Sequence, residues 1–314
     1  MPVNRWTRFI AKRLIYMALT LFIIVSATFF LMNLLPGTPY SNQDRLTAVQ
    51  LEMLNAKYGF DKPLLERYIS YLSNVLHGDF GISLQFNDQP VTTLLGSRVG
   101  PSVQLGLQAM LFGTVVGALL GVIAAMKQNT IIDYFCSVFA IMGRSVPNFV
   151  FAVFLQFVFA ITLSLLPVGL WNDGFRSTIL PTLALSISPM ADAARFVRTE
   201  MVEVLASDYI ELARAKGMSE IRLALTHGLR NALTPLITIM GPMTVSLMTG
   251  SLVVENIFAV PGIGEQFTKS ILTNDYYTIM AVTILFSTLL VVVIFITDIL
   301  YQLIDPRVRV EVKQ

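Results

Sequence analysis

Long runs of hydrophobic residues alternate with polar segments along the whole chain. A run of about 20 apolar residues, folded as an α-helix, is long enough to cross the hydrocarbon layer of a membrane. Six runs meet or approach this length, at residues 14–35, 101–126, 134–166, 178–194, 233–254 and 279–304. The pattern therefore predicts an all-α membrane protein with six transmembrane helices.

The polar segments between these runs set the expected topology. The longest covers residues 36–98, and within it residues 46–57 and 63–77 have the spacing and the glycine ends of helices. A second polar segment lies at 199–232 and a third at 255–277. We expect a helical extracytoplasmic insertion, then a cytoplasmic loop between the fourth and fifth spans, then an outer loop.

Basic residues indicate which side of the membrane each segment occupies. Cytoplasmic segments are enriched in Lys and Arg, and six spans place both termini on one side. On the expected inner side lie Arg5, Arg8, Lys12, Arg13, Lys127, Arg195, Arg198, Arg214, Lys216, Arg222, Arg230, Arg307, Arg309 and Lys313. The outer side holds Arg45, Lys57, Lys62, Arg67, Arg98, Arg176 and Lys269, mostly in the long insertion, where the rule is weakest. The expected topology is N-in, C-in.

Polar and small residues inside the spans suggest specific contacts. Gly113, Gly117 and Gly121 recur at four-residue spacing, which predicts close packing of two helices, although the nearby glutamines Gln104 and Gln108 could face a water-filled pathway.

The run 134–166 is too long for one straight span, and Pro147 predicts a break near residues 145–147. Arg144 lies just before that break, within the membrane. An intramembrane arginine needs a partner, and Asp192 or Asp298 on another span could neutralise it. The alternative is that Arg144 lines an aqueous pathway or reaches the inner headgroups.

Composition excludes several classes of function. The chain is 54% hydrophobic and 13% charged, with a mean hydropathy of +0.67, so an ordinary soluble domain is excluded. Its one cysteine, Cys136, cannot form an internal disulfide, and the net charge of +2 gives no indication of nucleic-acid binding. It lacks the phosphate-binding loop of ATPases and the common zinc-protease and serine-hydrolase motifs. We expect no enzyme and no metal site, so active transport would draw energy from an ion gradient or a partner.

The cytoplasmic segment 208–222 has the pattern of two short helices around a glycine. Asp208 can cap the first helix through its carboxylate, Gly217 can end it in a left-handed conformation, and Ser219 can start the second. A helix, turn and helix lying along the membrane is shaped to fit a groove on another protein.

This segment resembles the cytoplasmic signature of ABC importer permease subunits, in their dipeptide and oligopeptide branch. The signature reads Glu-Ala-Ala, three residues, Gly, nine residues, then Ile-x-Leu-Pro. Here it reads Glu211-Leu212-Ala213, then Gly217, then His227-Gly228-Leu229-Arg230, so the Leu is kept and the Ile and Pro are replaced. The outer segments Gly78-Asp79-Phe80-Gly81-Ile82-Ser83 and Glu255 to Gly264 are also similar to peptide-permease patterns.

The resemblance implies a pathway for dipeptides or oligopeptides formed with a second, similar permease. Two ATP-binding subunits would carry ATP and Mg, this chain would hold no cofactor, and an extracytoplasmic binding protein would deliver the peptide. Implied ATPase-coupling residues are Asp208, Glu211, Leu212, Ala213, Lys216, Gly217 and Met218. Glu255, Phe258, Pro261, Gly262 and Gly264 would contact the binding protein or form the outer gate, unless they only cap the structure.

Two other functions remain open from the sequence. An ion-coupled secondary transporter should show internal repeats and midplane carboxylates, and neither is evident. A permease of the same family could instead carry a peptide-like ligand such as glutathione or a metal chelate. A purely structural membrane protein would not need so elaborate a loop between spans.

Overall fold

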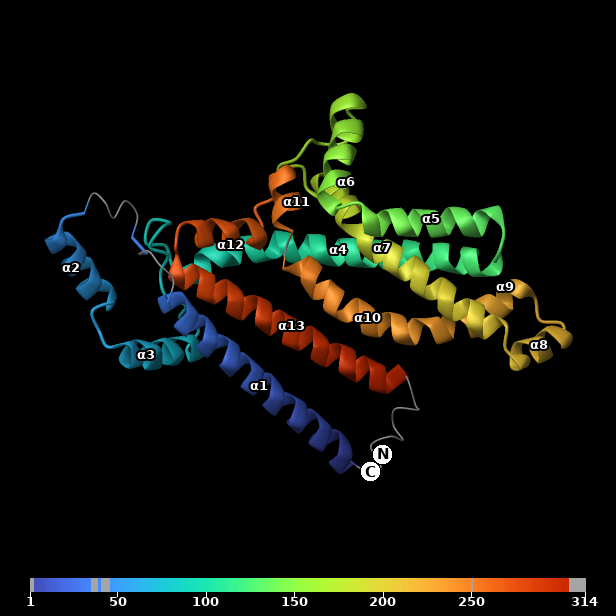
Figure 1. The fold of residues 1–314 in the computed structure, drawn as a ribbon, viewed down its shortest axis with the longest axis horizontal. Coiled ribbons are helices and arrows are strands. Elements are labelled where there is room, and N and C mark those ends of the chain that lie inside the picture. The colour runs from blue at the N-terminus through green and yellow to red at the C-terminus, as the bar shows by residue number, and fades with distance from the viewer. Residues whose placement is uncertain (1–2, 35–38, 41–45, 250, 305–314) are drawn as a thin grey trace. The chain divides into compact units, whose positions relative to one another are not determined.

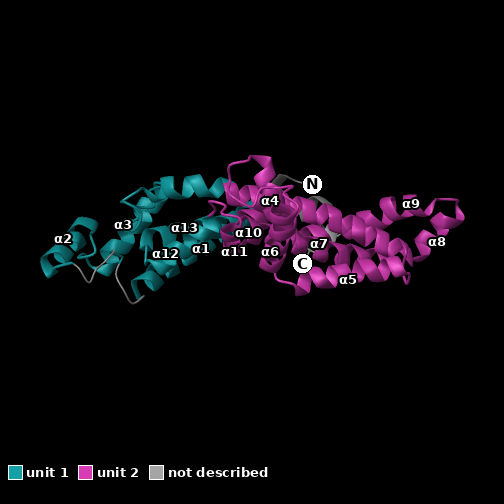
Figure 2. Cartoon of the chain, turned by 90° about the horizontal axis from the view of Figure 1, so that it is seen from above, with its two compact units in different colours: residues 1–100, 263–291 teal, residues 101–262, 292–314 magenta. Residues whose placement is uncertain are grey.

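The computed structural model describes residues 3–34, 39–40, 46–249 and 251–304, and every regular element in these residues is helical (Figure 1). The chain forms two compact units, one of residues 1–100 and 263–291, the other of residues 101–262 and 292–314 (Figure 2). The basic residues Arg45, Arg307, Arg309 and Lys313, on which the topology prediction partly depends, lie outside the described residues.

The first unit contains the N-terminal helix and the predicted insertion. Its elements are α1 (Val3–Leu34), α2 (Ala48–Tyr58), α3 (Leu64–Leu76), α12 (Ile263–Leu272) and the N-terminal parts of α4 (Val91–Met126) and α13 (Tyr276–Ile304). Helices α2 and α3 match the two helices that the sequence predicts there. A capping box of Thr47 and Gln50 starts α2, and Gly59, at φ +73°, ends it.

Aromatic and aliphatic side chains of distant segments form the core of this unit. Phe29 of α1 stacks on Tyr71 of α3 with ring centroids 5.3 Å apart, and both pack with Met280 of α13. The loop after α3 is tied to the start of α13, because the Ser83 hydroxyl donates to the buried Asp275 carboxylate at 2.5 Å. The Gly-Asp-Phe-Gly-Ile-Ser segment is therefore a packed structural element.

The second unit is arranged around one long helix, α7 (Phe175–Leu205). Helices α5 (Ile131–Ser145), α6 (Asn148–Leu155) and α10 (Arg230–Met248) pack on it. The remaining elements are the π-helical segments η2 (Gln156–Thr162) and η3 (Ala224–Leu229), the short helices α8 (Asp208–Ala215), α9 (Glu220–Leu223) and α11 (Leu252–Ile257), and the C-terminal parts of α4 and α13. Leu180, Ala184, Val197 and Met201 of α7 lie in its core.

Helix α7 is longer than the span 178–194 predicted from hydropathy. It continues through a charged stretch to Leu205, so the polar loop starts at Ala206 and not at residue 199. The extension is helical because it keeps an apolar face: Val197 and Met201, four residues apart, are both fully buried. The charged side chains on the other face lower the hydropathy of this stretch, so the apolar run alone predicted a span that ends too early.

Three glycines of α4 lie directly against α7. A Cβ atom added at Gly113 would come within 2.7 Å of the Ser186 carbonyl oxygen, and one at Gly121 within 2.6 Å of the Ala194 carbonyl oxygen. At Gly117 the overlap would be larger still, with the Met190 carbonyl oxygen. The helix backbones thus approach closely where side chains are absent.

The bend predicted at Pro147 is present. Helix α5 ends at Ser145 and α6 begins at Asn148, and the axes of the two helical segments on either side of the break differ by 103°. Pro147 cannot donate a backbone hydrogen bond and disfavours a helical conformation at Val146, which is extended.

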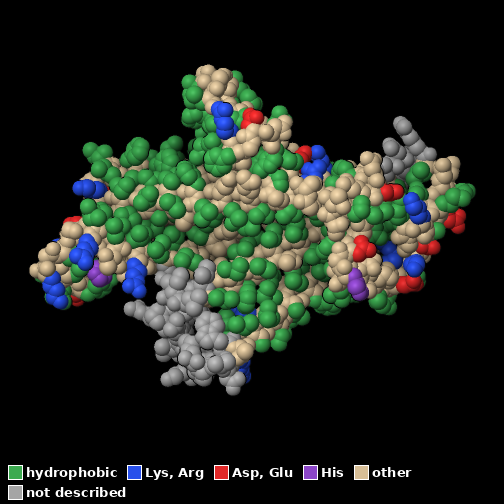
Figure 3. All heavy atoms as spheres, turned by 180° about the vertical axis from the view of Figure 1, so that it is seen from behind, with side chains coloured by type: hydrophobic (Ala, Val, Ile, Leu, Met, Phe, Trp, Pro, Cys, Tyr) green, Lys and Arg blue, Asp and Glu red, His purple; other side chains and the backbone are tan. Residues whose placement is uncertain are grey.

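Several described helices are long and apolar enough to cross a membrane. Three are continuous, Thr7–Leu34, Val91–Met126 and Tyr276–Ile299, and the number rises to five if the bent pairs Ile131–Ser145 with Asn148–Thr162 and Glu220–Leu233 with Leu236–Met248 are each one span. Large apolar side chains are exposed along these helices, for example Leu31, Phe135 and Phe154. In Figure 3 hydrophobic side chains cover much of the visible surface, as expected for a protein surrounded by lipid.

The contact between α4 and α7 predicts a sharp difference between two glycines of α4. Gly117→Ala should destabilise the protein by about 1–3 kcal/mol, because the new methyl group overpacks the helix contact. Gly96→Ala, at a glycine with open space around it, should be neutral or stabilising by up to about 1 kcal/mol. Both purified variants are heated in steps, and size-exclusion chromatography then measures how much folded protein remains, which gives the difference in thermal stability. Equal stability would show that the contact is not tight.

Candidate functional site

The segment after α7 folds as a helix, a turn and a helix, as the sequence predicts. Ser207, not Asp208, occupies the cap position, so the prediction that the Asp208 carboxylate caps α8 is wrong. Asp208 and Glu211 lie in the first turn and Arg214 in the last. Acidic groups at the start and a basic group at the end complement the helix dipole, so the charges still favour a short helix here.

Gly217 makes the turn possible. Its φ is +85°, and the amide of Met218 donates to the Ala213 carbonyl oxygen at 3.2 Å, which closes the end of α8. A side chain at residue 217 would have open space around it. The requirement for glycine is therefore conformational, because the left-handed backbone region costs other residues about 1–2 kcal/mol.

Buried side chains attach both short helices to the rest of the unit. Ile210 of α8 and Leu223 of α9 are completely buried. Gly228 of η3 lies against the Met201 side chain of α7. Helix α8 packs on α9, α9 on η3 and η3 on α7, so the two short helices are connected to α7 through η3.

An ion pair that the sequence pattern does not predict closes the turn. Arg214 of α8 donates to both carboxylate oxygens of Glu220 in α9, at 2.6 and 3.2 Å. The guanidinium lowers the pKa of the Glu220 carboxyl below its usual value. Both side chains are exposed, so the pair adds little to global stability and mainly restricts the angle of the turn. Its six-residue separation fits no regular helix pattern, so only the turn geometry reveals it.

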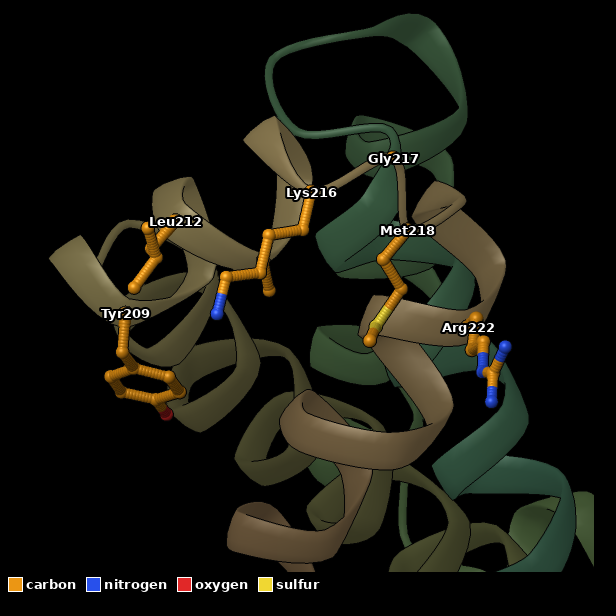
Figure 4. Close-up of a pocket in the computed structure, with 7 residues that line it drawn as sticks. Tyr209, Leu212, Lys216, Gly217, Met218 and Arg222 are labelled. Carbon is orange, nitrogen blue, oxygen red and sulfur yellow. The ribbon is translucent and has the colours of Figure 1, made fainter.

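A groove of about 350 Å³ lies between the two helices (Figure 4). Its walls combine apolar and basic groups: Tyr209, Leu212, Ala213, Lys216, Gly217, Met218 and Arg222. Five of these are predicted coupling residues, whereas Tyr209 and Arg222 were not predicted. Asp208 and Glu211 are exposed but do not line the groove. Leu212 is 57% exposed and Tyr209 49%, so the apolar wall is open to a partner.

The outer loop differs from the surface expected for a contact with another protein. Glu255, Phe258, Gly262 and Gly264 are buried, and Pro261 alone among the five predicted residues is exposed. The Ser102 hydroxyl donates to Glu255 at 2.7 Å, and a Cβ atom at Gly262 would overlap the Glu255 carboxylate. Four of the five predicted residues are therefore packed inside the chain, and at Gly262 there is no room for even a methyl group.

Arg144 contacts one of its two predicted partners. Its Nη1 lies 3.1 Å from Asp192 Oδ2, across the α5–α7 contact. A second pair, not predicted from the sequence, joins the same helices: Arg198 donates to both oxygens of the buried Asp133 carboxylate, at 2.5 and 2.8 Å. These partners lie 65 residues apart, and hydropathy carries no information on which charges meet.

Comparison with known proteins places the chain in a family. Residues 117–310 match the family described as the inner membrane component of binding-protein-dependent transport systems, and residues 6–94 match the N-terminal part of such components. The chain belongs to this family. It is therefore a multi-pass membrane subunit of a transport system. Members of this family are described as transport components and not as catalytic proteins.

Relatives cover almost the whole chain. The dipeptide transport system permease protein DppB of Lactococcus lactis is 47% identical over 96% of this chain and 99% of its own length. DppB of Bacillus subtilis is 40% identical over 98% and 99%, and the oligopeptide transport system permease protein OppB of Salmonella typhimurium is 42% identical over 96% and 99%. Among solved structures, the inward-facing MetNI methionine ABC transporter is similar in fold, with a TM-score of 0.56 and 20% identity over 68% of this chain and 97% of that one.

The Arg144–Asp192 contact predicts a rescue. Arg144→Ala should destabilise the protein, because it leaves the partly buried Asp192 carboxylate without its ion-pair partner. Adding Asp192→Asn should restore part of the loss, with a coupling of about 0.5–3 kcal/mol in thermal unfolding. Asp298→Asn in the Arg144→Ala protein is the control and should restore nothing. Equal rescue by both asparagine variants would contradict the assignment.

Proposed function

We propose that this chain is the transmembrane permease subunit of an ATP-driven importer of dipeptides or oligopeptides. The groove between α8 and α9 carries the proposal, because it is exposed, lies in a segment that resembles the signature of ABC importer permeases, and offers a mixed apolar and basic surface. Relatives named as dipeptide and oligopeptide permeases, similar over nearly the full length, support the substrate class.

The proposed assembly contains four further subunits. A second permease would complete the pathway, two ATP-binding subunits would bind ATP and Mg, and an extracytoplasmic protein would deliver the peptide. Six membrane spans with both termini in the cytoplasm would place α8 and α9 on the side where ATP is available. This chain would hold no cofactor and hydrolyse no ATP itself.

The mechanism depends on how the groove is attached. A binding element of the ATPase that inserts into the groove could contact Leu212 and Met218 through apolar atoms and Lys216 or Arg222 through a carboxylate. When ATP brings the two ATPases together, they would displace α8 and α9. Because the anchoring side chains of both helices are fully buried, the displacement would pass to helices α7 and α10, which flank the segment. The pathway would then change between inward-open and outward-open states.

Gly217 tests this proposal. Gly217→Ala should reduce ATP-dependent uptake about 5- to 30-fold, since a strain of about 1–2 kcal/mol would depopulate the turn that shapes the groove. Gly59→Ala is the matched control, because Gly59 also has a positive φ and no crowded neighbour but lies in the insertion. Uptake of a labelled dipeptide and ATP hydrolysis are measured in proteoliposomes of the complete complex. Full uptake by the Gly217 variant would contradict coupling through this turn, and uptake that persists without the ATPases would favour an ion-coupled transporter.

The outer loop offers a test of the extracytoplasmic partner. Ala259 and Pro261 are exposed, so Ala259→Cys or Pro261→Cys, in a Cys136→Ala background, should crosslink to the binding protein or to the second permease. Ile263→Cys is the control, because Ile263 is completely buried and should react with neither. Trapped partners are identified by mass spectrometry. Modification of the two exposed cysteine variants by a small soluble thiol reagent, with no partner trapped, would show that the loop is only a structural cap.

A further inference from the structure

A second cavity, unrelated to the α8–α9 groove, opens on the side of the second unit. It has a volume of about 210 Å³ and lies between α4, α5 and α7. Small and aliphatic side chains form its floor, among them Leu120, Ala140 and Ala194, which pack together. Arg195 and Arg198 of α7 lie at its edge. It therefore combines an apolar floor with a basic rim.

The charges at this rim do not cancel. Arg198 is occupied by the buried Asp133 carboxylate, which also accepts the Asn129 amide at 2.9 Å and the Ser137 hydroxyl at 3.4 Å. Arg195 is exposed and has no ion-pair partner among the described residues. The rim thus carries a net positive charge, supplied by Arg195, and has further donors on the outer edge of the Arg198 guanidinium.

The cavity lies close to the ends of its helices that adjoin the α8–α9 segment. Ala124 is two residues before the end of α4, and Arg198 is seven residues before the end of α7, or about 10 Å by helix rise. Ile141 lines the cavity and is exposed, as are Ile123 and Phe135, the sequence neighbours of the lining residues Ala124 and Cys136. Such side chains are typical of a surface in contact with lipid, so under the proposed topology the cavity would lie near the inner boundary between hydrocarbon and headgroups.

We propose that this cavity binds an anionic phospholipid. The phosphate would accept hydrogen bonds from Arg195 and the outer edge of Arg198, and the first part of an acyl chain would lie on the alanine floor. The volume is too small for a whole lipid, so the rest of the molecule stays in the bilayer. Basic pockets between transmembrane helices are established places for anionic headgroups. Assignment to the inner leaflet rests on the topology under the proposed function, whereas the binding itself does not.

Lipid competition in the assembled transporter tests the proposal. The complex is purified through a tag on this chain, placed in nanodiscs with equal amounts of phosphatidylglycerol and phosphatidylcholine of the same acyl chains, and re-extracted for native mass spectrometry. Phosphatidylglycerol should be retained at least about fivefold more, the ratio expected from about 1 kcal/mol for one basic side chain near an anionic lipid. Excess inorganic phosphate should not displace it, because the acyl chain contributes to binding.

Two variants separate a specific site from general attraction. Arg195→Gln should abolish the preference, whereas Arg230→Gln, an exposed arginine near the same helix ends but outside the cavity, should keep it. Thr199→Cys in the Cys136→Ala protein gives a second reading: Thr199 lines the cavity, so phosphatidylglycerol should slow alkylation of the new cysteine by N-ethylmaleimide.

Three results would overturn the proposal. The first is equal retention of the two lipids, and the second is an equal effect of the Arg195 and Arg230 variants on lipid preference. The third is that assembly with the second permease, and not lipid, protects the cysteine of the Thr199→Cys variant. The last result would identify the cavity as a protein interface. Loss of ATPase subunits from the purified complex would bear on the proposed function instead, since lipid retention by this chain is measured independently of transport.

Discussion

Close contact between the backbones of α4 and α7 is the constraint on which the second unit depends. Where Gly113, Gly117 and Gly121 face α7, even one methyl group would overlap a carbonyl oxygen, so the two helices can approach only in one register. In lipid, where hydrophobic burial offers little between helices, such van der Waals contact is a main source of association. Fixing α7 also restricts the position of α8, because the chain continues from Leu205 into α8 after only two residues.

The ion pairs between α5 and α7 add specificity to this packing. Arg198 and Asp133 are bonded at two points with the carboxylate buried, whereas Arg144 and Asp192 form a single, more exposed contact. A buried pair is weak evidence for stability, but separating it would leave an uncompensated charge, so it restricts how α5 can slide along α7. The more exposed pair, next to the bend at Pro147, constrains that junction less.

Local chemistry was predictable from the sequence, whereas most long-range contacts were not; Arg144 is an exception, because Asp192 was one of its two predicted partners. Gly217 indicated its left-handed conformation and Pro147 its bend, because each depends on the backbone of one or two residues. The family resemblance pointed to residues 208–222, where the expected helix, turn and helix are present. Neither source could show that Arg214 reaches Glu220, that Arg198 reaches Asp133, or that α7 continues to Leu205, since these depend on which faces meet after folding.

The outer loop shows that a recognisable motif can also serve packing within the chain. Its residues were expected to contact the binding protein, to form an outer gate or only to cap the structure, and Phe258 is 1% exposed, with its carbonyl accepting the Leu170 amide at 2.8 Å. Gly169 lies against the same backbone, so the motif joins two loops of this chain. In the α8–α9 segment the reverse holds: Ile210 and Leu223 are buried as anchors, and Leu212 and Tyr209 remain exposed. Tyr209 makes one aromatic contact, with His227, yet about half of its side chain stays exposed. This contrast with the buried outer loop supports the proposal that α8 and α9 form the surface for a partner.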